Sequence, residues 1–224
     1  MLDALAEFAA GAGHEINNPL SIINGRAKLL LNEITDTEQR RQLEIIVTQT
    51  LRAYEMIADI RFFARPPLPE IELFDLQTEL ETIVGEQSTL LNEHGIAVHL
   101  VFDNNQQGTK ISSDPVLLHT AVMLLCNNAR ESLLLSGIQG NIRIHADYAD
   151  GFWTIDVEDD GGGIDDEVAP HLFEPFYSGR PAGRGLGFGL PKVWRIMTML
   201  GGSVSYENTD SGAKFSLRIP VKLY

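Results

Sequence analysis

The apolar positions in the first third of the chain recur at steps of three and four residues, which is the period of a helix with one apolar face. In residues 2–34 these positions are Leu2, Leu5, Phe8, Ala12, Ile16, Leu20, Ile23, Ala27 and Leu30. A second series begins after a capping signal at Asp36 or Thr37 and reaches about residue 64; its members are Leu43, Ile46, Thr50, Tyr54, Ile57 and Ile60. We therefore expect two long helices joined by a short turn, with Pro19 removing one backbone donor and kinking the first helix.

A lone hairpin of this length cannot bury both of its apolar stripes. The economical solution is a dimer in which two hairpins form a four-helix bundle. The periodicity fits an ordinary dimerisation coiled coil equally well, so it assigns no function by itself.

The pattern changes after the proline-rich segment 65–69, which ends the second helix and predicts a stiff, extended linker. Helices and β-type runs then alternate: helices at 76–94, 115–136 and about 186–200, and β-type runs at 97–102, 141–148, 152–158, 203–206 and 213–219. Segregated helices over an antiparallel or mixed sheet predict an α+β sandwich. The expected organisation is a helical hairpin in residues 1–66 and a sandwich domain in residues 67–224.

Bulk properties narrow the classes of function. A net charge of -14 argues against non-specific nucleic-acid binding, which depends on Lys and Arg neutralising phosphates. The only cysteine is Cys126, so an intrachain disulfide is excluded. No apolar run approaches the ~20 residues that span a bilayer, and no signal-peptide pattern opens the chain. We expect a cytoplasmic protein, or the cytoplasmic part of a larger, membrane-anchored sensor.

Candidate chemistry begins on the first helix, with His14, Glu15 and Asn18. His14 and Asn18 are four residues apart and share a helix face. A histidine accepts a phosphoryl group when a ring nitrogen is unprotonated and a carboxylate, here Glu15, orients the ring or takes its proton. Asn18 is placed to orient a water for the reverse hydrolysis. Taken alone, such a histidine is more often an ordinary surface or core residue.

A pair of asparagines, Asn127 and Asn128, interrupts an otherwise apolar helix. Polar amides are costly in a core unless they are paired. An amide oxygen is a suitable hard ligand for Mg²⁺, which also takes waters and substrate phosphates. The plain alternative is that both amides face solvent.

Two glycine-rich segments complete the candidate residues. The first follows a strand, where Asp159 is placed to accept a hydrogen bond from an adenine amino group and Gly161 and Gly163 let backbone approach a flat ligand. The second, residues 183–190, opens a helix whose N-terminus would present backbone N–H groups to phosphate. Taken alone, the first segment is more often an ordinary turn with negative surface charge. The second is a weak signal because glycine-rich loops are common, and it is not a dinucleotide fingerprint because no strand runs directly into it.

The order and spacing of these segments resemble those of the sensor histidine kinases over residues 6–220. The stretch 14–20 looks like that family's phosphoacceptor motif. The residue sequence of this stretch and of residues 62–66 looks most like that of the nitrogen-regulation branch. The remaining motifs look like the asparagine motif at Asn128, the first glycine motif at Asp159, Gly161 and Gly163, the phenylalanine motif at 173–176, and the second glycine motif at Gly183, Gly185 and Gly187.

The resemblance implies a dimeric helical bundle followed by an ATP-binding α/β sandwich of the kind shared with gyrase and chaperone ATPases. It implies that His14 is phosphorylated from ATP with Glu15 as acid/base partner, and that the phosphoryl group passes to an aspartate of a response-regulator receiver domain. Asn18 would serve a phosphatase reaction toward that partner. Nucleotide would be bound by Asn127, Asn128, Asp159, Gly161, Gly163, Phe173, Gly183, Gly185, Leu186 and Gly187, with Asn128 as the Mg²⁺ ligand.

Two positions depart from the family pattern. Leu124 stands one turn before Asn128, where these kinases often carry another asparagine, and Glu131 stands where many carry a lysine. They leave open a degenerate module that binds nucleotide or a response regulator without catalysis. The hydrolysing relatives need a glutamate at the position of Leu124, which argues against a simple ATPase.

Overall fold

The computed structural model describes residues 2–103, 110–177 and 187–221, with the side chains of 2–14 and 90 outside the description. It divides into two compact units, Met1–Pro67 and Leu68–Tyr224. Each unit is described by itself.

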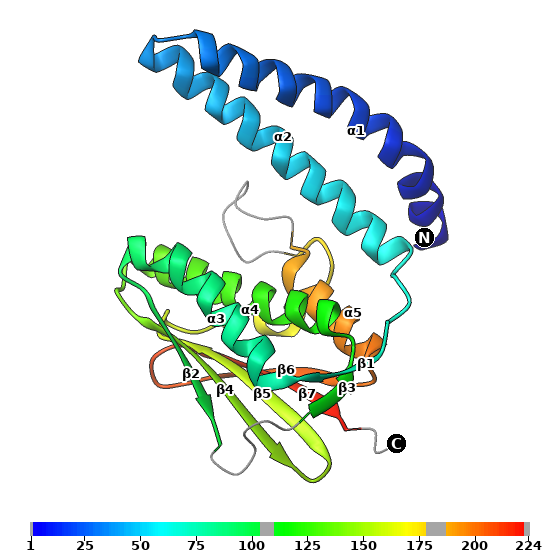
Figure 1. Ribbon diagram of the computed structural model, residues 1–224, viewed down its shortest axis with the longest axis vertical. Coiled ribbons are helices and arrows are strands. Elements are labelled where there is room, and N and C mark those ends of the chain that lie inside the picture. Colours follow the sequence, from blue (N-terminus) through cyan, green and yellow to red (C-terminus); the bar gives the residue numbers. More distant parts are fainter. Residues whose placement is uncertain (1, 104–109, 178–186, 222–224) are drawn as a thin grey trace. The chain divides into compact units, whose positions relative to one another are not determined.

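The first unit is a hairpin of two helices, α1 (Leu2–Glu33) and α2 (Thr37–Ala64) (Figure 1). The Asp36 side chain caps α2 by accepting a hydrogen bond of 2.9 Å from the Gln39 backbone N–H. Arg40 closes the turn because its guanidinium donates to the carbonyls of Leu31 and Ile34. The predicted helix pair is confirmed, and α1 passes through Pro19 as one continuous, gently curved helix.

The seam between the two helices is partly polar. Asn24 donates a hydrogen bond of 2.8 Å to the Thr50 hydroxyl, and both side chains are buried. Ala27 is also buried there, whereas Ile16, Ile23 and Leu30, spaced every seven residues, are 38%, 46% and 44% exposed. The apolar stripe of α1 is therefore only partly covered by α2.

The second unit is a sandwich with three helices over one face of a five-stranded sheet (Figure 1). The strand order is β2-β4-β5-β7-β6, and the pair β2–β4 is parallel while all other neighbours are antiparallel. The strands are β2 (Ala97–Phe102), β4 (Asn141–Ala149), β5 (Phe152–Asp159), β6 (Ser203–Asn208) and β7 (Ala213–Pro220). The helices are α3 (Leu76–Leu91), α4 (Pro115–Ser136) and α5 (Gly189–Met199). This agrees with the predicted α+β sandwich.

Alternation along the strands separates a buried face from a polar face. On β5 the buried positions are Trp153, Ile155, Val157 and Asp159. Each large apolar side chain in this row contributes roughly 1.5–3 kcal/mol through burial. The same periodicity carries Asp159 into the helix-covered layer at the strand's end, which is an unusual place for a carboxylate.

A small second sheet was not predicted. It pairs β1 (Glu72–Asp75) antiparallel with β3 (Lys110–Ser113). Each strand has only four residues, too few for a clear alternation, so the pattern does not distinguish them from loop. The Asp114 carboxylate links the end of β3 to the segment before β1. It caps α4 by accepting a hydrogen bond from the Leu117 N–H and also accepts one from the Glu70 N–H.

Two short 3₁₀ turns complete the unit, η1 (Asn92–His94) and η2 (Ala169–His171). The first lies within the segment 76–94 that was expected to be wholly helical. The tighter turn ends at Gly95, whose φ of 69° reverses the chain into β2.

Candidate functional site

Asp159 is the most informative residue of the sandwich unit. It is 2% exposed at the C-terminal end of β5, and its Oδ1 accepts a hydrogen bond of 2.8 Å from the Gly161 backbone N–H. Burial raises the pKa of this carboxyl above its usual value, although the hydrogen bond from the Gly161 backbone N–H acts to lower it. Among the residues that the structure describes, no Lys or Arg forms an ion pair with Asp159. A buried carboxyl whose pKa is raised and that has no cationic partner among the described residues is a candidate functional group.

Gly161 is held against α4 so closely that no larger residue fits. A Cβ built on it would lie 2.1 Å from the Ser132 hydroxyl oxygen and 2.7 Å from the Asp159 carboxylate. Ser132 also donates to the Gly161 carbonyl at 3.3 Å. The helix and the loop therefore meet at Gly161, and the absence of a side chain there keeps the carboxylate in place.

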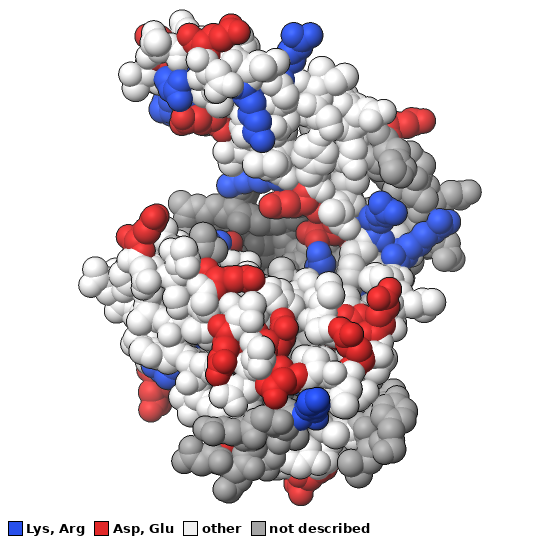
Figure 2. All heavy atoms as spheres, in the orientation of Figure 1, with Lys and Arg blue, Asp and Glu red and all other residues white. Residues whose placement is uncertain are grey.

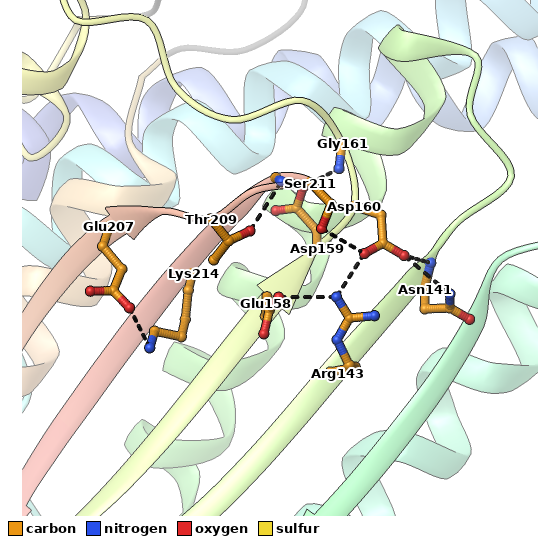
Figure 3. A network of polar contacts seen from close by, with 11 residues as sticks. Asn141, Arg143, Glu158, Asp159, Asp160, Gly161, Glu207, Thr209, Ser211 and Lys214 are labelled. Atoms are coloured by element: carbon orange, nitrogen blue, oxygen red, sulfur yellow. Dashed lines mark hydrogen bonds and ion pairs between the residues drawn. The ribbon is translucent and has the colours of Figure 1, made fainter.

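The neighbouring Asp160 belongs to a separate polar network (Figure 3). It accepts from the Asn141 backbone N–H at 2.9 Å and from the Arg143 guanidinium at 2.7 Å, and Arg143 also bonds Glu158 at 3.0 Å. Burial acts to raise the pKa of Asp160, but the hydrogen bonds from Arg143 and Asn141 outweigh it and lower the pKa to about 2. This network ties the ends of β4 and β5 together below the loop.

The loop after Asp160 is anchored on the β6–β7 hairpin. The Asn208 side-chain amide forms two hydrogen bonds with the backbone of Ile164. It accepts from the Ile164 N–H and donates to the Ile164 carbonyl, each at 2.8 Å. Gly163 has a φ of 82° and lies against Asn208, and Gly162 donates to the Ser211 carbonyl at 3.1 Å. The first glycine segment is thus a fixed loop with left-handed backbone that non-glycine residues rarely adopt.

Asn127 and Asn128 lie on α4, and both are partly exposed. Asn128 is one helical turn before Ser132, so its side chain projects from the same face that contacts the Gly161 loop. The described residues contain no cluster of three or more His, Cys, Asp or Glu side chains able to hold a metal by themselves. A cation here would therefore depend on few protein ligands plus substrate oxygens, which is the usual coordination of Mg²⁺.

The segment 173–177 meets the start of α5. The rings of Phe176 and Phe188 pack edge to face with centroids 4.7 Å apart. Gly187 has a φ of 69°, and a Cβ on it would lie 2.2 Å from the Tyr177 carbonyl oxygen. Phe173, three residues before Phe176, is half-buried. Gly183, Gly185 and Leu186, which were predicted to bind nucleotide, lie outside the described residues.

In the hairpin unit, the predicted phosphoacceptor turn is helical. His14, Glu15 and Asn18 all lie within α1, and the side chains of Glu15 and Asn18 are exposed. The His14 side chain lies outside the description. Tyr54 of α2 reaches this region, because its hydroxyl donates to the Asn17 carbonyl at 3.2 Å and lies 2.5 Å from the Ser21 hydroxyl.

The acidic composition is visible at the surface of the sandwich unit, where Asp and Glu side chains are more frequent than Lys and Arg on the face that Figure 2 shows. None of the described helices is both long and apolar enough to cross a membrane.

Comparison with known families identifies both units. Residues 4–68 match the His Kinase A (phospho-acceptor) domain, and residues 113–223 match the histidine kinase-, DNA gyrase B-, and HSP90-like ATPase family. The chain belongs to the sensor histidine kinases. Its two matched domains follow one another in the order that the sequence motifs predicted.

Individual relatives agree with this assignment. This histidine kinase chain is 27% identical over 98% of its length to the signal transduction histidine-protein kinase AtoS of Escherichia coli (strain K12), of which it spans 35%. It spans 24% of the two-component sensor PprA of Pseudomonas aeruginosa and 50% of sporulation kinase C of Bacillus subtilis (strain 168).

Solved structures share the fold. Full-length ShkA in complex with AMPPNP aligns with a TM-score of 0.81 at 23% identity, over 97% of this chain and 46% of that chain. Histidine kinase ThkA in complex with the response regulator protein TrrA aligns with a TM-score of 0.69 at 21% identity, over 99% and 63%.

Several residues of the site were missed by sequence reasoning. Ser132 is detectable in principle, since it lies four residues after Asn128 on one helix face. Asn208 and Arg143 have no such signal, because Asn208 contacts Ile164, 44 residues away in the chain, and Arg143 contacts Asp160, 17 residues away. Phe188 was read only as part of a glycine-rich stretch, yet it is 4% exposed and packs on Phe176.

Proposed function

We propose that this chain binds ATP in the sandwich unit, phosphorylates His14 and passes the phosphoryl group to an aspartate of a response-regulator receiver domain. The observation that carries the proposal is the buried Asp159 carboxylate, which has no cationic partner among the described residues and is held by a loop whose glycines exclude side chains. Such a group is suited to accept hydrogen bonds from an adenine amino group. The AMPPNP in the ShkA complex supports a nucleotide as the ligand.

Asn128 is suited to act as a ligand for Mg²⁺ at this site. Its amide oxygen is a hard donor on the α4 face that leads to Ser132 and the Gly161 loop. Bound Mg²⁺ would supply charge neutralisation at the phosphates. Leu124 offers no second amide, and Asn127 is the other asparagine that this helix provides. Asn128→Asp should abolish autophosphorylation and leave the dimer intact.

The hairpin residues then have distinct roles. His14 accepts the phosphoryl group through an unprotonated ring nitrogen, and the exposed Glu15 orients the ring or takes its proton. Asn18, exposed four residues later on the same face, orients a water when the chain dephosphorylates its partner. Both phosphoryl transfers, from ATP to the His14 ring nitrogen and from that nitrogen to the receiver aspartate, depend on positioning and charge stabilisation.

A second copy covers the open face of the hairpin. Ile16, Ile23 and Leu30 are exposed at seven-residue spacing, which is the pattern of a helix packed in a left-handed bundle. Burying this stripe in a four-helix bundle removes apolar surface that the isolated hairpin leaves in water.

The receiver domain would dock on α1 after His14. Ser21, Ile22, Gly25, Arg26 and Leu29 line a shallow groove there, and Ile22 and Leu29 are 65% and 58% exposed. A docked partner would cover this apolar surface and bring its aspartate to the phosphorylated histidine. The complex of ThkA with TrrA supports a receiver protein as the partner.

Labelled ATP with Mg²⁺ tests the proposal. The wild-type chain should acquire acid-labile, base-stable phosphate, and His14→Gln should acquire none. A degenerate module would bind nucleotide without labelling. Steady ATP hydrolysis that persists in His14→Gln would indicate a gyrase- or chaperone-type ATPase instead.

A further inference from the structure

The turn of α1 that directly follows the phosphoacceptor lacks one helical hydrogen bond because it contains Pro19. Pro19 has no N–H, so the bond that a regular helix would make to the Glu15 carbonyl is missing, and the proline ring crowds that carbonyl. The affected turn runs from Glu15 to Pro19 and contains Asn18. Unless something else holds it, this turn has more freedom to bend than the rest of α1.

Tyr54 of α2 is hydrogen-bonded to this turn of α1. Its hydroxyl donates to the Asn17 carbonyl at 3.2 Å. A tyrosine hydroxyl has one hydrogen, so the Ser21 hydroxyl, 2.5 Å away, is the donor in the second contact. The result is a directed chain from Ser21 through Tyr54 to Asn17. Its two ends on α1 lie two residues before and two residues after Pro19, and its middle lies on α2.

We propose that Tyr54 is a positioning residue that fixes the α1 turn around Pro19 and so holds Asn18 in the orientation needed for dephosphorylation of the receiver domain; the inference rests on the proposed function. Asn18 is the residue next to the tethered carbonyl, and its side chain is exposed. Orienting a water requires a defined position of the Asn18 amide, which adjoins the tethered Asn17 carbonyl, whereas His14 and Glu15 lie two or more residues before that carbonyl. Dephosphorylation is therefore more sensitive than autophosphorylation to the loss of this tie.

Tyr54→Phe is the direct variant, because it removes the hydroxyl and keeps the ring. We expect dephosphorylation to slow about three- to tenfold while autophosphorylation changes less than about twofold. The substrate is a receiver domain selected because it accepts phosphate from the wild-type chain. Amide hydrogen exchange in residues 16–22 should accelerate by a similar factor, and exchange in residues 25–31 should not.

Thr50→Val is the matched control, since it also removes an interhelical hydrogen bond, the one from Asn24, farther along α1 from His14. We expect it to lower the melting temperature without changing the ratio of dephosphorylation to autophosphorylation. An equal shift of this ratio in both variants would mean general loosening and would overturn the proposal. So would unchanged exchange and an unchanged ratio in Tyr54→Phe. Failure of the proposed function is seen separately, as the absence of wild-type labelling on His14.

Discussion

Asp159 and Asp160 are adjacent in the chain, yet their carboxylates serve opposite sides of the sheet and their pKa values move in opposite directions. Asp159 points into the helix-covered layer toward Ser132, and burial raises its pKa. Asp160 joins Arg143 and Asn141, and their hydrogen bonds outweigh burial and lower its pKa to about 2. The strand's alternation separates a carboxylate available to a ligand from one used to hold the loop.

Asp160 predicts an acid-sensitive contribution to stability. Its folded pKa of about 2 lies below the usual 3.8, so the carboxylate stabilises the fold above pH 4 and this stabilisation is lost as the pH falls from 4 toward 2. Asp160→Asn should lower the free energy of unfolding at pH 7 by roughly 1–2 kcal/mol. Denaturant unfolding of both proteins at several pH values checks this, and the difference should shrink as the pH falls toward 2. A gap of the same size at all pH values would contradict the linkage.

Asp159→Asn should separate ligand binding from stability. Burial raises the pKa of Asp159, so folding disfavours its charged form, and this cost to stability appears as the pH rises through the folded pKa. An amide resembles the neutral form, so we expect an unchanged or higher melting temperature at pH 7. ATP affinity, measured by calorimetric titration, should fall about tenfold or more, because the amide retains one acceptor oxygen but its NH₂ opposes an adenine amino group. Wild-type affinity in this variant would remove Asp159 from the site.

Gly161→Ala should damage both the fold and the site. The new Cβ would lie 2.1 Å from the Ser132 hydroxyl and 2.7 Å from the Asp159 carboxylate, so α4 and the loop must move apart. We expect a loss of about 1–3 kcal/mol in the free energy of unfolding, together with weaker ATP binding. Gly85→Ala is the matched control, because its Cβ meets nothing within 4 Å inside α3 and should stabilise the helix by about 0.5–1 kcal/mol. Equal effects of the two substitutions would refute the close-packing argument.

Asn18→Ala should spare autophosphorylation of His14 and slow dephosphorylation of the receiver domain. The side chain is exposed, so its removal should leave the melting temperature within about 2 °C. Parallel time courses of kinase labelling and receiver dephosphorylation provide the measurement. Equal dephosphorylation by wild type and variant would exclude Asn18 from the reaction.

The helices and most strands were predictable because they depend on local periodicity. The steps of three and four residues predicted a second helix that follows a cap at Asp36 or Thr37 and reaches about residue 64, and α2 is Thr37–Ala64. The predicted strand at 97–102 is β2. Segments of four residues, such as β1 and β3, were missed because each is stabilised by pairing with a distant strand rather than by its own pattern.

The sequence by itself determined the family, the order of the two domains and the identity of the candidate residues, because motif spacing and helical period are properties of neighbouring positions. Only the tertiary structure decided that Asp159 is buried without a cation among the described residues while Asp160 is paired with Arg143. It alone joined Tyr54 to the turn around Pro19, across 37 residues of sequence. Such contacts depend on which faces of distant elements pack together. The local pattern of hydrophobic and polar residues does not specify that packing.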